Sequence, residues 1–155
     1  MTSSAVVAAV DWGTSSLRIW LLDSAGEIVA EQRSDEGMQV AREKGFAQIL
    51  DRLLGELAAA PTLPVIICGM AGARQGWVEA PYVTVPAALD EVLAGAIRIP
   101  AASRDIRIIP GLAQRNADAP DVMRGEETQL GGAAARLGAG DNIVCLPGTH
   151  SKWVG

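Results

Sequence analysis

The chain has 155 residues, of which 49% are apolar, 20% charged and 4% aromatic, and its formal net charge is -5. That length suits one domain or one lobe of a larger protein, and it can bury enough surface to fold without disulfides or a structural metal. With 13 Lys and Arg against 18 Asp and Glu, the sequence lacks the basic patch of a nucleic-acid-binding protein. It also lacks a charged secretory leader and an apolar run of about 20 residues, so we expect no membrane partner and a cytoplasmic location.

The first part of the chain predicts three strands joined by hairpins. The apolar or alternating runs that indicate them are residues 5–10, 16–22 and 28–30. Asp11 closes the first run, and Gly26 provides the turn before the third. The polar residues 31–36 are expected to lead away from the sheet.

An amphipathic helix and a buried strand follow. Apolar residues at helical spacing predict the helix over about 44–60, with Pro61 and Pro64 ending it. The continuous apolar run 63–68 is typical of a strand buried on both faces. It opens into a segment of small residues, 69–77, at the strand's carboxyl end.

Short helices and strands alternate in the second half. We expect a helix with Pro86 as its first residue, a strand over 106–109, a helix around 130–137 ended by Gly138, and a last strand over 142–146. Three hairpin-connected strands followed by this alternation indicate an α/β domain with a mixed sheet, whose site lies beyond the strand ends.

Cys68 and Cys145 each end a short apolar run. A cysteine in that position usually behaves as a small buried hydrophobic residue. We therefore expect both to be reduced, buried and structural.

The turn after the first strand contains an acid, a glycine and three hydroxyl residues, in the string Asp11-Trp12-Gly13-Thr14-Ser15-Ser16. Its backbone N–H groups and hydroxyls can face phosphate oxygens, while Asp11 can hold Mg²⁺ directly or through water. A hairpin built from turn-favouring residues explains the same string without a ligand.

The segment 147–152 repeats this composition after the last predicted strand. Two such turns on one sheet suggest a clamp on a polyphosphate. Lys152 is either a cationic partner for phosphate or a solvated lysine on an edge strand. His150, the single histidine, either packs and caps the turn or acts as a catalytic base, although no neighbouring acid orients it.

Glu126 and Glu127 lie at the start of the third predicted helix. The helix dipole favours acids there whatever the function. Counting back four and three residues from Leu130, however, places at least one carboxylate towards the sheet end. Such a carboxylate could take the proton from a hydroxyl that attacks a γ-phosphate.

A polar and aromatic cluster follows the buried strand. Its members are Arg74, Gln75, Trp77 and Tyr82. Arginine can grip a carboxylate with two parallel hydrogen bonds, and Trp77 could form an apolar wall for a sugar chain. An ordinary surface loop is the alternative.

Four motifs in this order resemble the 2-dehydro-3-deoxygalactonokinase family, within the superfamily of actin, sugar kinases and Hsp70. The matching strings are Asp11-Trp12-Gly13-Thr14-Ser15-Ser16, Gly69-Met70-Ala71-Gly72-Ala73-Arg74-Gln75-Gly76-Trp77, Met123-Arg124-Gly125-Glu126-Glu127-Thr128-Gln129 and Leu146-Pro147-Gly148-Thr149-His150-Ser151-Lys152-Trp153. The resemblance implies an actin-like, ribonuclease H-like lobe. It also implies ATP- and Mg²⁺-dependent phosphorylation of the C6 hydroxyl of 2-dehydro-3-deoxy-D-galactonate, in galactonate catabolism.

Site roles follow from the resemblance. Asp11 corresponds to the acid associated with Mg²⁺. The residues that would face the phosphates are Gly13, Thr14, Ser15, Gly148 and Thr149. Gly125-Glu126 stands where related sugar kinases have a Gly-Asp-x-Gln string, whose Asp is the catalytic base. Because Glu is one methylene longer than Asp, both Glu126 and Glu127 are candidates for the base, and we prefer Glu126. Arg74 and Arg124 are candidates to bind the substrate's carboxylate.

The resemblance also implies a second, nucleotide-binding lobe, and no part of residues 1–155 corresponds to it. We therefore expect an amino-terminal kinase lobe that could be inactive alone. The expected partners are ATP and a sugar acid, with a homodimer as the candidate assembly. The rival interpretations are a sugar-acid sensor lobe without catalysis, a kinase for another sugar acid, and a phosphatase of the same fold.

Overall fold

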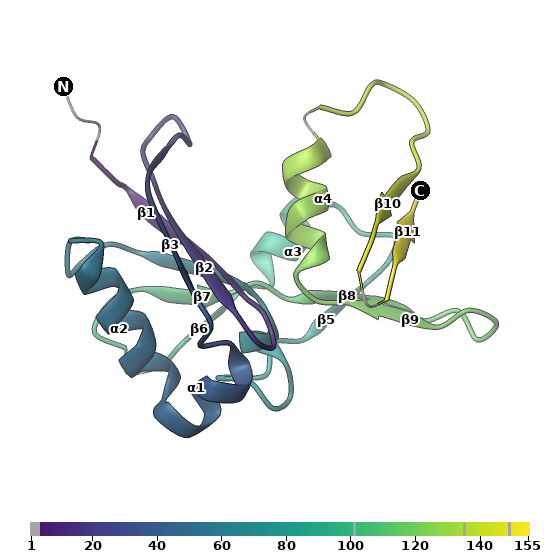
Figure 1. Ribbon diagram of the computed structural model, residues 1–155. Helices are drawn as coiled ribbons and strands as arrows, with labels where there is room; N and C mark the ends of the chain where they lie inside the picture. The colour runs from purple at the N-terminus through teal and green to yellow at the C-terminus, as the bar shows by residue number, and fades with distance from the viewer. Residues whose placement is uncertain (1–3, 101, 135, 149) are drawn as a thin grey trace.

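A mixed sheet of six strands organises the first two thirds of the molecule (Figure 1). The computed structural model describes residues 4–100, 102–134, 136–148 and 150–155. The strands lie in the order β3-β2-β1-β4-β7-β6. Their bounds are Val7–Trp12 for β1, Leu17–Leu22 for β2, Ile28–Ser34 for β3, Val65–Gly69 for β4, Ile97–Arg98 for β6 and Ile106–Ile108 for β7. The predicted mixed-sheet α/β fold with a three-strand meander is confirmed.

Strand directions place the carboxyl ends of β1, β4 and β7 at one edge. β1 is antiparallel to β2 and parallel to β4, β4 is parallel to β7, and β6 returns antiparallel to β7. In this register Asp11 pairs with Cys68 and Trp12 with Gly69, so β1 and β4 end side by side. This is the edge at which ligands of open α/β sheets bind.

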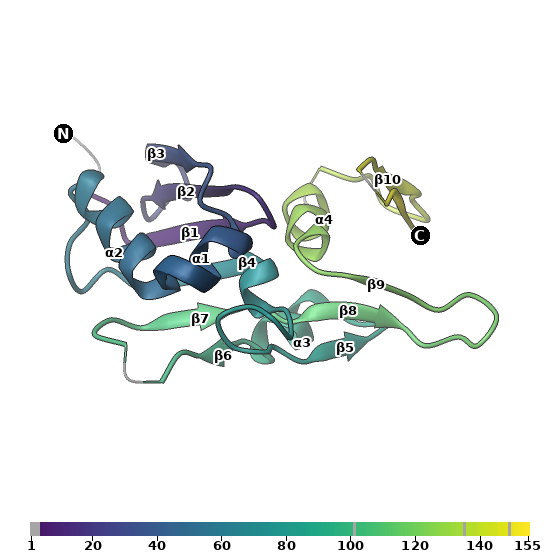
Figure 2. The same cartoon turned by 60° about the horizontal axis from the view of Figure 1, so that its bottom comes forward.

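Two helices, α1 (Met38–Lys44) and α2 (Phe46–Glu56), pack together against the sheet (Figure 2). Their apolar side chains share one core with alternate residues of β1 and β2; Leu50 and Ile19, for example, are completely buried. The prediction of one helix over 44–60 is wrong in its bounds. Gly45, at φ +94°, separates the two helices, and α2 ends before the prolines.

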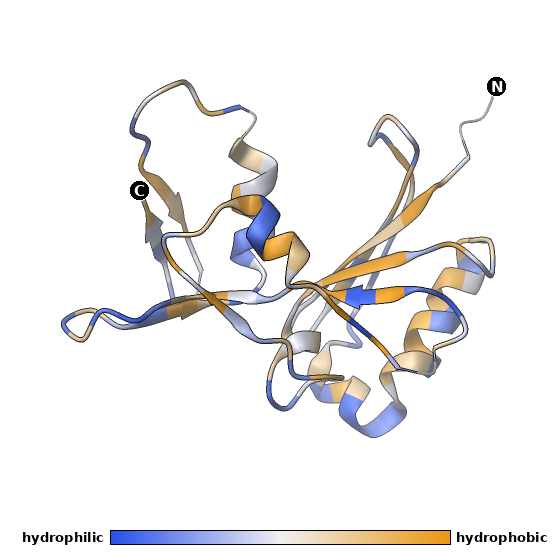
Figure 3. Cartoon of the chain, turned by 180° about the vertical axis from the view of Figure 1, so that it is seen from behind, coloured by the Kyte–Doolittle hydropathy of each residue, from blue (hydrophilic) through white to orange (hydrophobic). Residues whose placement is uncertain are grey.

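The second half forms two smaller sheets. β5 (Tyr82–Thr84), β8 (Gly111–Gln114) and β9 (Asp121–Met123) make one, and β10 (Val144–Leu146) pairs with β11 (Lys152–Val154) in the other. Polar residues occupy the loop between β8 and β9, at the left edge of Figure 3, whereas the strands of the main sheet are largely apolar. The remaining helical segments are η1 (Met70–Gly72), α3 (Leu89–Ala94) and α4 (Glu126–Ala134).

Three further predictions need correction. Pro86 does not begin a helix, because α3 starts at Leu89, with Glu91 accepting the Ala88 N–H. The two candidate phosphate turns do not share a sheet, since the second connects β10 with β11 in the separate two-stranded sheet. Cys68 is buried as expected, but Cys145 is exposed, because β10 pairs with β11 alone.

No helix within the described residues is long and apolar enough to cross a lipid bilayer.

Candidate active site

Glycine contacts bring three distant backbone segments together at the end of the sheet. Gly69, at φ +89°, closes β4 so near to β1 that a Cβ there would lie 2.7 Å from the Trp12 carbonyl oxygen. A Cβ on Gly125, at φ +113° just before α4, would lie 3.4 Å from the Gly69 Cα. Because these positive φ angles and close approaches suit glycine, the ends of β1 and β4 and the start of α4 form one cluster.

The turn after β1 is held against the start of α1. The Gly13 N–H donates to the Ser16 carbonyl at 2.8 Å, and the Gly13 carbonyl accepts the Met38 N–H at 2.9 Å. A Cβ on Gly37 would lie 2.4 Å from the backbone of Ser15. The turn is therefore fixed by backbone contacts while the side chains of Thr14 and Ser15 remain exposed.

Asp11 is a partly buried carboxylate at this cluster, with 29% of its side chain exposed. Burial raises its pKa, the Arg18 guanidinium 3.9 Å away opposes that shift, and the negative charge of Glu126 adds to it. The Cys68 thiol lies 4.0 Å from the Asp11 Oδ1, and burial raises the pKa of this thiol to about 12. Cys68 is thus a neutral neighbour of Asp11.

The two acids at the start of α4 have different surroundings. Glu126 is half-buried, and its Oε2 accepts the Arg124 N–H at 2.9 Å. Glu127 is 4% exposed, and burial is the main cause of its raised pKa. The structure therefore places Glu126, rather than Glu127, on the side of Asp11.

A cavity of about 700 Å³ gathers many of the candidate residues from distant parts of the sequence. The sequence-derived candidates that line it are Asp11, Thr14, Tyr82, Arg124, Glu126, Gly148, His150 and Lys152. Thr149 lies outside the described residues, while Gly13 and Ser15 flank Thr14 without lining the cavity. One space therefore joins the first turn, the start of α4 and the β10–β11 turn.

Arg124 stands at the wall of this cavity with an incomplete set of partners. Its guanidinium carbon lies 4.3 Å from the centre of the Tyr82 ring, and its Nη2 donates to the Ala80 carbonyl at 2.9 Å. Its Nε and Nη1 are buried and have no acceptor among the described residues. A Cβ on Gly72 would lie 2.9 Å from Nη1, so glycine leaves space for the guanidinium.

Lys152 and His150 belong to the other side of the cavity. Lys152, whose side chain is 11% exposed, forms a salt bridge with Asp121 of β9, and this bond lowers the pKa of Asp121. His150 is exposed and also contributes to that lowering through its charge. Lys152 is therefore not a solvated lysine on an edge strand, because it is largely buried and paired with the carboxylate of Asp121.

The structure separates the predicted loop cluster. Tyr82 lines the cavity, but Arg74 and Gln75 are exposed and do not line it. Trp77 packs into the core, with its ring 5.7 Å from that of Phe46 and 6.3 Å from that of Trp12. A substrate-binding role of Arg74, Gln75 and Trp77 stays a prediction, and their positions outside the cavity do not favour it.

The chain's own residues fit a single Mg²⁺ ion beside bound phosphates. Mg²⁺ in such sites is bound through one or two carboxylates, with phosphate and water completing six ligands. Asp11 is a partly buried carboxylate at the cavity wall, and Glu126 lines the same cavity close enough for its charge to raise the pKa of Asp11. Within the described part of the chain, no group of three or more His, Cys, Asp or Glu gathers as a metal cage.

The raised pKa of Asp11 predicts a cost in stability. Because the folded state holds the Asp11 proton more tightly than the unfolded state, this carboxyl reduces the free energy of unfolding as pH rises above 3.8. Asp11→Asn should therefore be more stable than the parent at pH 7, and this gain should vanish towards pH 3. Urea unfolding across this range measures the difference.

Asp105→Asn is a control of opposite sign. Arg107 lowers the pKa of Asp105, mainly through a side-chain hydrogen bond. This carboxylate therefore stabilises the fold above pH 3.8, and its contribution fades at lower pH. The variant should lose stability at pH 7 and little at pH 3. A parallel response of both variants would contradict the assigned burial of Asp11.

Sequence reasoning missed the contact between Gly69 and Gly125 and the stacking of Arg124 on Tyr82. The run of small residues from 69 did indicate close backbone approach, but not its partner. No local signal links Tyr82 with Arg124, because they lie 42 positions apart and meet through the pairing of β5 and β9 with β8.

The order β3-β2-β1-β4-β7, the acid at the end of β1 and the acidic start of α4 beside it define an α/β lobe of the actin-like kinase class. The family described as 2-keto-3-deoxy-galactonokinase matches residues 11–155. The chain belongs to this family.

Relatives with assigned names agree with the family. The chain is 61% identical, over 99% of its length, to a protein of Rhizobium meliloti named "Probable 2-dehydro-3-deoxygalactonokinase" and 39% identical, over 94%, to the 2-dehydro-3-deoxygalactonokinase of Escherichia coli. A crystal structure from Sinorhizobium meliloti with the same provisional name matches 96% of the chain at a TM-score of 0.92 and 62% identity. The chain spans about half the length of these proteins, which are covered over 50%, 48% and 49%.

Proposed function

We propose that the complete protein transfers the γ-phosphoryl group of ATP to the C6 hydroxyl of 2-dehydro-3-deoxy-D-galactonate. The observation that supports this best is the 700 Å³ cavity, which collects Asp11, Thr14, Arg124 and Glu126 around one space. Membership in the 2-keto-3-deoxy-galactonokinase family supports the reaction class, phosphoryl transfer. The acceptor that we propose for this protein is the one in the names of its relatives.

Glu126 is the proposed general base. It lines the cavity close enough to Asp11 for its charge to raise the pKa of that carboxyl. As the C6 oxygen bonds to the γ-phosphorus and the bond to the ADP oxygen breaks, the hydroxyl proton would pass to the Glu126 carboxylate. The hydrogen bond from the Arg124 N–H holds one carboxylate oxygen and leaves the other free for that proton.

The phosphates of ATP would lie between two turns. Thr14, flanked by Gly13 and Ser15, lines the cavity from the turn after β1, and Gly148 and Lys152, the first residue of β11, line it from the other side. A phosphate contact of Thr149, which lies outside the described residues, stays a prediction. Mg²⁺ bound by Asp11 would offset negative charge on the phosphate oxygens. The second lobe that would hold the adenine stays a prediction, as do a cytoplasmic location and a homodimer.

Arg124 is the preferred partner for the substrate's carboxylate. Arg124 lines the cavity, and its Nε and Nη1 have no acceptor among the described residues, so a carboxylate there could accept charge-assisted hydrogen bonds from its guanidinium. Arg124→Met should raise the KM for the sugar acid by about 10- to 100-fold, because charge-assisted hydrogen bonds are lost. The KM for ATP should change much less.

Arg74→Met is the matched control, since Arg74 is exposed and outside the cavity. Its KM for the sugar acid should stay within about twofold of the parent value, as is usual for surface changes. The reverse ranking of the two variants would assign the carboxylate to Arg74.

A coupled ADP assay of the complete protein tests the proposed function directly. We expect ADP release that depends on both Mg²⁺ and 2-dehydro-3-deoxy-D-galactonate, with weaker turnover of other sugar acids. Calorimetric binding of the sugar acid with no ADP formation would instead indicate a sensor. Equal turnover across a panel of acceptors would indicate a different sugar kinase.

A further inference from the structure

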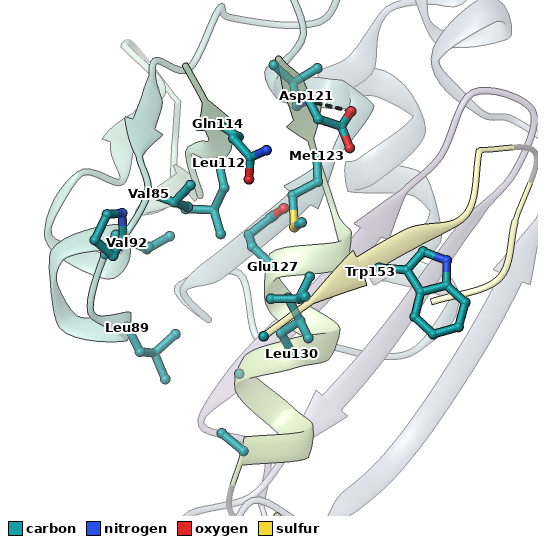
Figure 4. Close-up of a pocket in the computed structure, with 17 residues that line it drawn as sticks. Val85, Leu89, Val92, Leu112, Gln114, Asp121, Met123, Glu127, Leu130 and Trp153 are labelled. Carbon is teal, nitrogen blue, oxygen red and sulfur yellow. Dashed lines mark hydrogen bonds between the residues drawn. The ribbon is translucent and has the colours of Figure 1, made fainter. Parts of the chain in front are cut away.

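Glu127 is the one buried charged or polar side chain among the described residues, with 4% of its surface exposed. It faces away from the proposed catalytic cavity. It lines a second cavity of about 390 Å³ whose walls are mainly apolar, and Figure 4 shows it there between Met123 and Leu130. Burying a carboxylate in such surroundings is costly unless hydrogen bonds compensate it, so the contacts of Glu127 indicate its purpose.

The carboxylate of Glu127 binds the backbone immediately before it. Its Oε2 accepts the Gly125 N–H at 2.7 Å, and its Oε1 is 3.4 Å from the Thr128 hydroxyl. The backbone N–H of Glu127 also stabilises the charged form of this carboxyl group. These contacts fold the side chain back over the first turn of α4 and fix the peptide group between Arg124 and Gly125.

That peptide group determines where Glu126 lies. Gly125 has φ +113° and packs against Gly69, which in turn contacts the end of β1 next to Asp11. Glu126, the residue after Gly125, is thereby directed into the 700 Å³ cavity, while Glu127 points into the apolar cavity. The two adjacent acids thus divide into one that faces the reaction space and one that holds the backbone.

We propose that Glu127 is a positioning residue, whose buried carboxylate holds the Gly125 N–H and so aims Glu126 at the acceptor hydroxyl. The inference rests on the proposed function of Glu126. Glu127 itself neither contacts substrate nor takes up the proton, since it does not line the catalytic cavity.

Three substitutions in the complete protein separate positioning from proton transfer. Glu127→Gln keeps an amide oxygen that can accept the Gly125 N–H, so kcat should fall less than about tenfold, with KM values near the parent's. Glu127→Leu has a similar volume and no acceptor, and kcat should fall about 100-fold through misplacement of Glu126. Glu126→Gln removes the base, with a loss of about 10²- to 10⁴-fold.

The pH profile of kcat distinguishes the roles. Both Glu127 variants should retain the fall in kcat at low pH that a carboxylate base produces, whereas Glu126→Gln should lose it. Hydrogen exchange of the Gly125 amide adds a readout without substrate: its protection should persist in Glu127→Gln and disappear in Glu127→Leu.

Gly125→Ala provides a second route if Glu127→Leu does not fold. A Cβ at φ +113° strains the same turn without touching the carboxylate, so kcat should fall while the low-pH limb remains. The inference is overturned if Glu127→Gln is as inactive as Glu126→Gln and loses the low-pH limb, or if Glu127→Leu retains the parent kcat. A fully active Glu126→Gln would instead refute the role of Glu126 as the base, while the kinase activity itself would stand.

Discussion

Glu126→Gln is expected to lower kcat for phosphorylation of the sugar acid by about 10²- to 10⁴-fold, the usual contribution of a general base. The amide is nearly the same size as the carboxylate and can still accept the Arg124 N–H, so the turn before α4 should keep its shape. What is lost is the group that takes the hydroxyl proton. Steady-state kinetics with the ADP-coupled assay measures the effect.

Substrate binding should survive this change. Because glutamine removes the negative charge beside Asp11 but no direct contact with ATP is assigned to Glu126, the Kd for ATP should stay near the parent value. Glu79→Gln, at an exposed glutamate outside the cavity, is the matched control and should retain full activity. A Glu126→Gln enzyme with normal turnover would show that another group accepts the proton.

Local patterns predicted the elements whose side chains alternate between core and surface. β2 alternates buried residues with half-buried or exposed ones, and β4 is almost wholly buried, so their apolar spacing was readable from the sequence. β3 was predicted too short, at 28–30 instead of 28–34, because an edge strand with no residue fully buried has a polar second half. The helix α1, which follows at 38–44, was not predicted separately because its seven residues offer little periodicity.

The candidate site was predictable in composition and not in assembly. The acid after β1 and the acids before Leu130 were identified from their places at element ends. Their meeting depends on Gly125 packing against Gly69, a contact between residues 56 positions apart that no local spacing encodes. Trp77 could not be assigned from the sequence, because an aromatic residue in a polar loop can bind a sugar or pack against the core. In the structure it stacks on Phe46, so it packs against the core.

Gly69→Ala is expected to destabilise the fold strongly, because this position combines a positive φ with a close approach to backbone. Gly69 has φ +89° and ψ -150°, a region populated almost only by glycine, which costs other residues about 1–3 kcal/mol. Its new Cβ would also lie 2.7 Å from the Trp12 carbonyl oxygen, a backbone atom that cannot rotate away. Overpacking of this kind adds about 1–3 kcal/mol, so we expect a total loss of about 2–6 kcal/mol in the free energy of unfolding.

Gly26→Ala isolates the part of this effect that comes from the clash. Gly26 has φ +82°, but a Cβ there would meet no atom within 4 Å, so only the conformational cost of about 1–2 kcal/mol applies. Urea unfolding of both variants measures the difference. Because the Gly69 Cβ would also come within 3.4 Å of Asp11 Oδ1, Gly69→Ala should reduce kcat even where it folds, whereas Gly26→Ala should not. Equal stability of the two variants would mean that β1 and β4 can separate at this end without cost, and that Gly69 does not bring Asp11 and Glu126 together.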